Sequence, residues 1–308
     1  MADNTNNKRR VGLSGRLADT DIRLLRIYRT VVESGGFSSA EIELNISRAA
    51  ISIAISDLEQ RLSLRLCLRG RGGFSLTEQG DEVYQATLQL FSALEDFRTQ
   101  VNGIHQQLKG ELNIGITDNL VTMPRMKVTT ALANLKQAGP EVRVNIRMIP
   151  PSDVEKGVLG GLLHTGVVPV LKERPGLEYL VLYKEESHLY CSNKHPLFNE
   201  PSSALTVDLL ESVEAVVPAY AQSASIKAIY QKMNGTATAT DREGIAFLIL
   251  TGHYVGYLPT HFAERWLLQG QLKALLPEKA KYRTSIAAVS RKGVKSNAVL
   301  DYYLTQLL

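Results

Sequence analysis

The stretch Ile42-Glu43-Leu44-Asn45-Ile46-Ser47-Arg48-Ala49-Ala50-Ile51-Ser52-Ile53-Ala54-Ile55-Ser56-Asp57-Leu58 has the pattern of a short helix, a tight turn and a second helix. Ser47 stands where the second helix begins, and a serine at that position caps a helix by accepting a backbone N–H. The aliphatic residues that follow are spaced by four, three and four positions: Ile51, Ile55, Leu58 and Leu62. Because these spacings fall on one face of an α-helix, the stretch predicts a helix–turn–helix with a buried aliphatic face.

The other face of the second helix carries mostly small or polar side chains: Ser47, Arg48, Ala49, Ser52, Ile53 and Ser56. Small side chains let a helix lie close to base edges in the major groove of DNA. The glycine-rich residues 69–76 then indicate a β-hairpin with Arg69 and Arg71 at its tip, where we expect contacts to phosphate. Ser38 and Ser39 open the preceding short helix, and either capping of this helix or a phosphate contact would explain them.

Two segments flank this mainly α, winged helix–turn–helix module, which we place at residues 18–76. We expect residues 1–17 to form a disordered tail, and residues 77–109 to form one long linker helix capped by Thr77. The apolar residues of this helix alternate at spacings of three and four, interrupted only by Thr87: Val83, Leu90, Leu94, Phe97, Val101, Ile104 and Leu108. Packing on the chain's own body would bury this heptad stripe, but we favour pairing with a second copy, so the helix is predicted to form a dimer.

The bulk composition is that of an ordinary globular protein of 308 residues with a net charge of +4. Residues 1–76 hold 12 Lys and Arg against eight Asp and Glu, which suits a polyanionic partner. Two cysteines are too few for a disulfide framework, and no apolar run approaches the roughly 20 residues that cross a bilayer, so we expect a cytoplasmic protein. We predict neither an enzyme nor a metal or cofactor site, because the sequence lacks catalytic carboxylate pairs, metal-ligand clusters and phosphate-binding glycine loops.

After Gly110 the chain changes to β-rich runs separated by helical stretches. Strands are expected at residues 111–117, 142–149, 165–170, 179–183, 188–192, 213–218, 236–240, 254–258 and 284–290. Helices are expected at residues 122–137, 151–161, 223–233, 241–252, 260–269 and 296–307. This alternation is typical of an α/β fold with a largely parallel sheet.

Six stretches, taken in their order and spacing, resemble the LysR-type transcriptional regulators: Leu24-Leu25-Arg26-Ile27-Tyr28, Gly36-Phe37-Ser38, residues 47–66, Leu76-Thr77-Glu78-Gln79-Gly80, Gly110-Glu111-Leu112-Asn113-Ile114-Gly115 and Gly256-Tyr257-Leu258-Pro259. The likeness extends over nearly the whole chain, from about Leu17 to Leu308. The second helix departs from the family pattern at two places. Arg48-Ala49 replaces the common Gln-Pro, and Ile53 stands where an arginine usually follows the serine.

The resemblance implies that residues 110–308 form an effector-binding α/β domain like a periplasmic binding protein. Its two subdomains would comprise residues 110–180 with 284–308, and residues 181–283. An organic acid or similar metabolite would bind between them and modulate promoter binding. The implied partners are double-stranded promoter DNA, a second copy in a homodimer or homotetramer, and RNA polymerase. The alternative function is a solute-binding protein with an accessory helical domain and no regulatory DNA binding.

Candidate effector-binding residues stand at strand ends, where ligands gather in α/β sheets. Thr117, Asp118 and Asn119 follow the first strand of the α/β domain. The resemblance implies that the Thr117 hydroxyl meets an anionic effector, whereas helix capping is the alternative for Asp118 and Asn119. Further candidates near later strand ends are Val168, Pro169, Tyr220 and His253.

Overall fold

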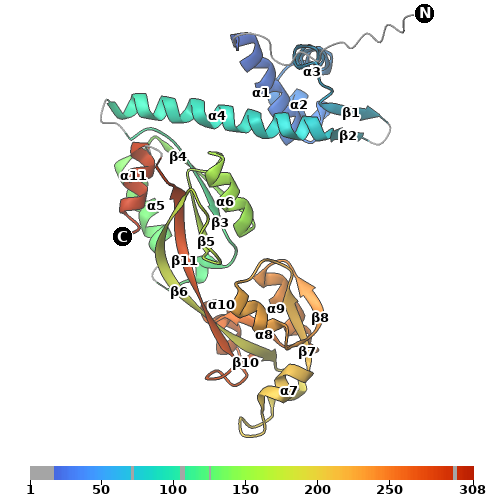
Figure 1. Ribbon diagram of the computed structural model, residues 1–308, viewed down its shortest axis with the longest axis vertical. Coiled ribbons are helices and arrows are strands. Elements are labelled where there is room, and N and C mark those ends of the chain that lie inside the picture. The colour runs from blue at the N-terminus through green and yellow to red at the C-terminus, as the bar shows by residue number, and fades with distance from the viewer. Residues whose placement is uncertain (1–16, 71–72, 105–107, 125, 294–296) are drawn as a thin grey trace, which may run out of the picture. The chain divides into compact units, whose positions relative to one another are not determined.

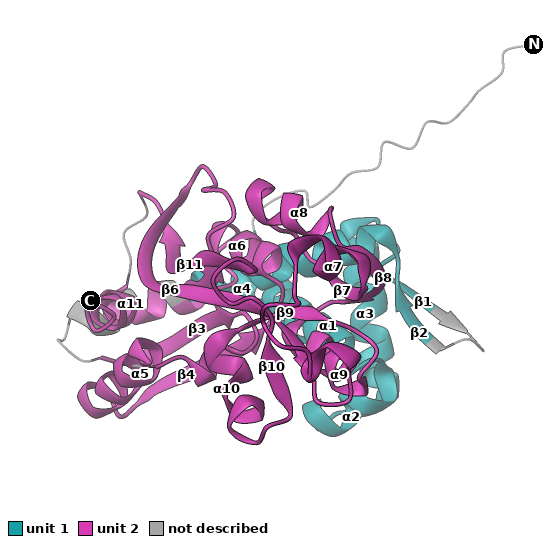
Figure 2. Ribbon diagram, turned by 90° about the horizontal axis from the view of Figure 1, so that it is seen from below, with its two compact units in different colours: residues 1–94 teal, residues 95–308 magenta. Residues whose placement is uncertain are grey.

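The computed structural model describes residues 17–70, 73–104, 108–124, 126–293 and 297–308. The chain divides into two compact units, residues 1–94 and residues 95–308, which Figure 2 shows in different colours. Most of the tail predicted at residues 1–17 therefore lies outside the described residues. No helix among the described residues combines the length and the apolar character that a membrane crossing requires.

Unit 1 begins with three helices, α1 (Asp19–Glu33), α2 (Phe37–Leu44) and α3 (Arg48–Leu62). The turn between α2 and α3 is tight because Asn45 adopts the left-handed conformation, with φ of 52°. The Ser47 Oγ accepts the backbone N–H of Ala50 at 3.3 Å, so the predicted helix–turn–helix and its cap are confirmed. The capping role considered for Ser38 is wrong, because the cap position of α2 is Gly36, two residues before Ser38, and the helix has no side-chain cap.

The aliphatic face of α3 forms the core of unit 1 together with α1. Ile51 and Ile55 are completely buried, as their spacing predicted. The buried Tyr28 hydroxyl donates a hydrogen bond to the carbonyl of Gly80 at 2.7 Å, which ties α1 to the linker helix. An ion pair of 3.2 Å between Arg61 and the buried Asp21 fixes the end of α3 to the start of α1.

The strands β1 (Cys67–Gly70) and β2 (Gly73–Leu76) pair in an antiparallel hairpin, so the predicted wing is confirmed. The Glu59 carboxylate accepts the backbone N–H of Leu66 at 2.7 Å and that of Cys67 at 3.1 Å. These bonds join α3 to the start of the hairpin. The position of the wing is therefore set by a side chain of the helix itself.

The linker helix α4 (Glu78–Ile104) starts where expected. The Thr77 Oγ1 accepts the N–H of Gly80 at 2.8 Å and donates to the carbonyl of Arg65 at 2.6 Å. Residues 105–107 lie outside the described residues. Leu108 follows them without helical structure, and its side chain packs against the core of unit 2. The prediction that Leu108 continues the dimer stripe is therefore wrong, because Leu108 is not helical and its side chain packs within unit 2.

Unit 2 is built on a seven-stranded sheet with the order β10-β6-β11-β5-β3-β4 and with β9 paired to β6. Its strands are β3 (Gly110–Ile116), β4 (Val142–Met148), β5 (Thr165–Pro169), β6 (Leu177–Ser192), β9 (Gly256–Pro259), β10 (Leu272–Ala274) and β11 (Lys281–Arg291). Only the β3–β4 and β3–β5 pairs of this sheet are parallel, and β6 and β11 pair antiparallel to their neighbours. The expectation of a largely parallel sheet is wrong, because β11 brings the chain back beside β6 in the opposite direction.

Unit 2 consists of two lobes, and the first lobe is built around β3, β4 and β5. The helices of this lobe cover both faces of the sheet (Figure 1). On one face lie α5 (Lys127–Ala138) and α11 (Ala298–Thr305), whose apolar residues share a core with β3. On the other face lies α6 (Pro151–Leu159). A side chain at Gly166 would bring its Cβ within 2.1 Å of Val154 Cγ1, so α6 can approach this closely only because residue 166 is glycine.

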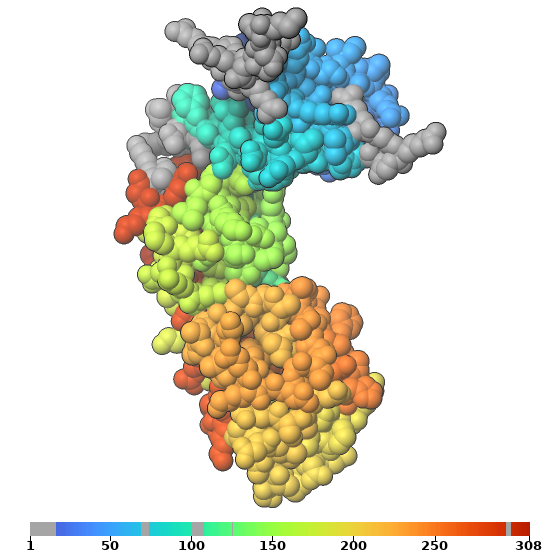
Figure 3. Space-filling view, turned by 45° about the vertical axis from the view of Figure 1, so that its right-hand side comes forward, coloured from blue at the N-terminus to red at the C-terminus, as the bar shows by residue number. Residues whose placement is uncertain are grey.

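The second lobe of unit 2 surrounds a small parallel sheet of β7 (Glu214–Pro218) and β8 (Asn234–Ala239). Its helices are α7 (Val207–Ser212), α8 (Ala224–Tyr230), α9 (Arg242–Thr251) and α10 (Thr260–Leu268). The short 3₁₀ turns are η1 (Leu120–Thr122) and η2 (Pro196–Phe198). The sequence pattern did not predict α7 or β10. In Figure 3 the two lobes are the green and the yellow-to-orange bodies of atoms.

The strands β6 and β11 run through both lobes and connect them. β6 is one continuous strand of 16 residues, so the prediction of two separate strands at 179–183 and 188–192 is wrong. The subdomain boundaries expected at 180/181 and 283/284 fall inside these two strands. The connection between the lobes is therefore a pair of extended strands and not a loop.

Candidate functional site

The outward face of α3 is the candidate nucleic-acid interface of unit 1. Its side chains are exposed apart from Ser52, which is half-buried: Ser47, Arg48, Ala49, Ile53 and Ser56. Ser38 and Ser39 are exposed in the first turn of α2. Arg69 lies in β1, and Arg71 falls outside the described residues. The face that would meet a base edge is thus open to solvent, and the roles of these residues stay predictions.

The linker helix α4 carries an exposed apolar stripe. Leu94, Phe97 and Val101 are 42%, 66% and 40% exposed, although large apolar side chains usually avoid water. Val83 and Leu90, nearer the start of the helix, are half-buried against the core of unit 1, and Ile104 is the last residue of α4. Among the residues of the predicted stripe whose side chains are described, the exposed ones are therefore Leu94, Phe97 and Val101.

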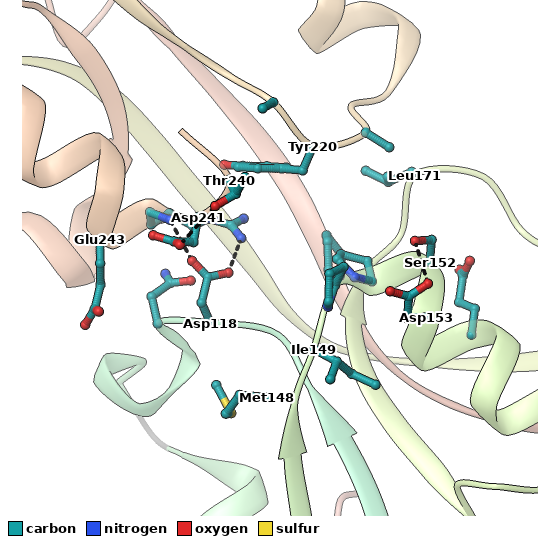
Figure 4. A pocket seen from close by; sticks show the side chains of 18 of the residues that line it. Asp118, Met148, Ile149, Ser152, Asp153, Leu171, Tyr220, Thr240, Asp241 and Glu243 are labelled. Carbon is teal, nitrogen blue, oxygen red and sulfur yellow. Dashed lines mark hydrogen bonds and ion pairs between the residues drawn. The ribbon is translucent and has the colours of Figure 1, made fainter. Parts of the chain in front are cut away.

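Unit 2 contains a cavity of about 1340 Å³ between its two lobes. The first lobe contributes side chains from residues 118–122, 148–159 and 169–175, which follow β3, β4 and β5. The second lobe contributes side chains from residues 219–221, 240–243 and 262–265. In Figure 4, Asp118 lies beside Thr240 and Asp241, while Ser152 and Asp153 lie on the opposite side. The cavity thus sits at the carboxyl ends of parallel strands, where ligands bind in α/β folds.

Asp118 and Arg242 form a two-point contact across this cavity. One carboxylate oxygen of Asp118 accepts the backbone N–H of Arg242 at 2.7 Å, and the other accepts the guanidinium Nη1 at 2.8 Å. Arg242 is the first residue of α9, so the Asp118 carboxylate also lies at the positive end of the helix dipole. The anion site formed by Arg242 and the amino end of α9 is therefore occupied by a side chain of the protein itself.

A buried carboxylate, Glu185 of β6, extends this contact into a network. Arg242 Nη2 lies 3.6 Å from Glu185, and the imidazole of His261 lies 3.1 Å from the same carboxylate. The second ring nitrogen of His261 is 2.7 Å from the hydroxyl of Thr122. The network joins residues after β3 in the first lobe to the amino ends of α9 and α10 in the second lobe. It therefore connects the two lobes through the strand β6.

The guanidinium of Arg242 also lies over the ring of Tyr220, 5.3 Å from its centre. Burial alone would lower the pKa of Arg242, but Tyr220, Glu185 and Asp118 outweigh burial, so its pKa lies above the ordinary arginine value. Burial raises the pKa of Tyr220 above the usual phenol value. At neutral pH the network therefore holds a charged arginine beside a neutral phenol.

Four of the seven predicted effector-binding residues line the cavity: Asp118, Asn119, Pro169 and Tyr220. Asn119 is buried, and neither amide atom has a hydrogen-bond partner among the described residues. Such unsatisfied polar groups are costly unless a ligand or water meets them.

The other three predicted residues do not line the cavity. The buried Thr117 hydroxyl lies 3.5 Å from the carbonyl of Val167, and Val168 packs completely buried against α6. His253 is exposed beyond the carboxyl end of α9, whereas the cavity meets the amino end of this helix. Sequence reasoning missed Arg242, Glu185 and His261. The one signal for Arg242 was its place directly after Asp241, which caps α9.

Comparisons with known proteins agree with this architecture. Residues 22–81 match the family described as "Bacterial regulatory helix-turn-helix protein, lysR family", and residues 105–306 match "LysR substrate binding domain". The HTH-type transcriptional activator BauR of Pseudomonas aeruginosa is 52% identical over 290 residues, which cover 94% of this chain and 95% of BauR. These descriptions are those of DNA-binding regulators and not of enzymes.

Solved structures show the same fold at much lower sequence identity. The crystal structure of CbnR, a LysR family transcriptional regulator, has a TM-score of 0.67 at 15% identity and covers 93% of this chain and 97% of CbnR. Full-length CbnR complexed with its target DNA has a TM-score of 0.66 at 17% identity and covers 93% of this chain and 98% of CbnR. The chain, with its helix–turn–helix unit and its two-lobed α/β unit, belongs to the LysR family of transcriptional regulators.

Proposed function

We propose that this regulator binds promoter DNA as a dimer through α3 and the β1–β2 wing, and that a small molecule in the cavity of unit 2 changes this binding. The observation that carries the proposal is the division of α3 into a buried aliphatic face and an exposed face of mostly small and polar side chains. The alternative, a solute-binding protein with an accessory helical domain, gives no reason for that exposed face.

The proposal also covers the oligomeric state of the regulator, its protein partner and its place in the cell. The exposed stripe of α4 pairs two copies, and two dimers form the tetramer. RNA polymerase is the partner through which transcription changes, and the name of the 52% identical relative supports activation as the outcome. Promoter DNA as target requires the regulator to work in the cytoplasm.

An organic acid is the effector that the cavity suits. The guanidinium of Arg242 and the amino end of α9 attract a carboxylate, while Met148 and Ile149 offer apolar surface. Because Asp118 already occupies the anion site, the effector carboxylate must displace the Asp118 carboxylate. Effector binding thereby breaks one connection between the lobes and lets them move.

The Arg48→Ala variant tests DNA binding. A good contact between an arginine and a base edge is worth about 1–3 kcal/mol, so we expect at least about a thirtyfold loss of affinity in a dimer that makes two such contacts. The measurement is gel retardation of a duplex from the protein's own upstream region as the salt concentration rises. Arg143→Ala, which removes an exposed arginine of unit 2, is the matched control. Absence of retardation by the natural protein at low salt would contradict the proposal.

The effector site is tested by thermal unfolding with a panel of organic acids. A ligand at about 100 times its Kd adds about 2.7 kcal/mol of stability, so a bound acid raises Tm. Asp118→Asn removes the competing charge and should increase this shift at equal acid concentration. Asp153→Asn, at the opposite side of the cavity, should leave the shift unchanged. An Asp118→Asn protein that no longer responds would show that Asp118 binds the effector directly.

A further inference from the structure

We propose that Ile53 contacts the 5-methyl group of a thymine in each half-site, and so specifies an A·T pair at that position. This inference rests on the proposed DNA-binding function. Ile53 is 63% exposed on the outward face of α3, although Ile51 and Ile55, two residues to either side, are completely buried. The side chain therefore serves neither the core nor the packing of the three helices.

The neighbours of Ile53 on the helix surface leave it projecting. Ala49 and Ala50 precede it by one turn, and Ser56 and the exposed Asp57 follow it by one turn. Because these side chains are short, the helix backbone can come close to base edges and the isoleucine reaches furthest at this point. The position suits an apolar contact at the floor of the major groove.

The chemistry of the major groove decides which base this side chain tolerates. Thymine is the only base with a methyl group on that edge, whereas G·C pairs present polar donors and acceptors. An isoleucine against a G·C pair would remove water from those polar groups without replacing their hydrogen bonds. Ile53 therefore favours thymine by contact and disfavours G·C by desolvation.

The surroundings of Ile53 indicate DNA as its occupant, in preference to a protein. Arg48 and Ser56 are exposed on α3, and Ser47 is exposed at its cap, so a cation and hydroxyl groups share the surface that carries Ile53. Protein-docking surfaces need a contiguous apolar patch at their centre. Within α3, whose residues are all described, Ile53 is the one exposed large apolar side chain, while Ile42 and Ile46 are exposed on α2 and in the turn before α3. The helix α3 therefore offers no broad apolar patch of its own, and its surface matches base recognition.

The experiment begins with a duplex selected from a randomised pool by the natural protein. Each thymine of the selected site is then replaced by deoxyuridine, in both half-sites at once, and Kd is measured at fixed salt. Burial of one methyl group is worth about fourfold in affinity, so the two half-sites together give about fifteenfold. We expect one thymine position to show this loss with the natural protein.

The variants separate this contact from a general effect on DNA binding. Ile53→Ala should bind the thymine and deoxyuridine duplexes equally, while Ile53→Val keeps two methyl groups and should retain most of the discrimination. Ile42→Ala is the control, because Ile42 is 86% exposed on α2, and its loss should leave discrimination at the natural value. Equal Tm values of all three variants and the natural protein verify folding.

Two results would overturn the inference. One is a selected site in which no thymine methyl affects the Kd, and the other is an Ile53→Ala protein that still discriminates. A failure to select any duplex is a different result, since it would overturn the proposed DNA-binding function itself.

Discussion

Replacement of Phe97 by aspartate will convert the dimer into a monomer. Phe97 is 66% exposed in α4, and Leu94 and Val101 continue the same apolar stripe, so a charge at this point would be buried between two helices only when they pair. An unpaired buried charge costs several kcal/mol, so association of the two α4 helices becomes unfavourable. Because Phe97 contacts water in the single chain, the fold of the monomer should remain intact.

The loss of pairing should also weaken DNA binding by about 10²- to 10⁴-fold, because the two half-sites would no longer be bound by one linked molecule. Sedimentation gives the mass, and gel retardation gives the affinity. Gln85→Asp adds the same charge to an exposed position on the other side of α4 and should leave the protein dimeric. A dimeric Phe97→Asp protein would show that another surface joins the copies.

Replacement of Arg242 by alanine will have the largest effect on the stability of unit 2. The variant would leave the Asp118 carboxylate and the fully buried Glu185 carboxylate without their shared cation. Removal of one partner of a buried ion pair costs about 3–5 kcal/mol, which is a large part of the stability of an ordinary domain. The main cause is the desolvated charge on Glu185, which would keep only the imidazole of His261 as a partner in this network.

Urea unfolding followed by the fluorescence of Trp266 measures this loss, because Trp266 is the single tryptophan of the chain and lies in α10 of unit 2. Lys172→Ala removes an exposed cation from the wall of the same cavity and should change the stability by less than about 0.5 kcal/mol. Combining Arg242→Ala with Glu185→Gln should restore part of the loss, since the second change removes the stranded charge. An Arg242→Ala protein as stable as the natural one would mean that water already screens the network.

The helix–turn–helix could be predicted from sequence because its determinants are close together in the chain. The cap at Ser47 and the buried residues Ile51 and Ile55 lie within three turns of one helix, so spacing alone defines the two faces. The direction of the sheet could not be predicted in this way. β6 and β11 pair across about 100 residues, and a run of polar residues at 184–187 made one strand look like two.

The sequence by itself determined the class of most segments, the exposed and buried faces of α3, the apolar stripe of α4 and the place of Asp118 after β3. Only the tertiary structure decided what Asp118 contacts. Arg242 stands 124 positions further along the chain, and Glu185 reaches the same point from the middle of β6. Helical periodicity acts over a few residues, whereas this network forms only where two lobes meet, so no local pattern could have predicted it.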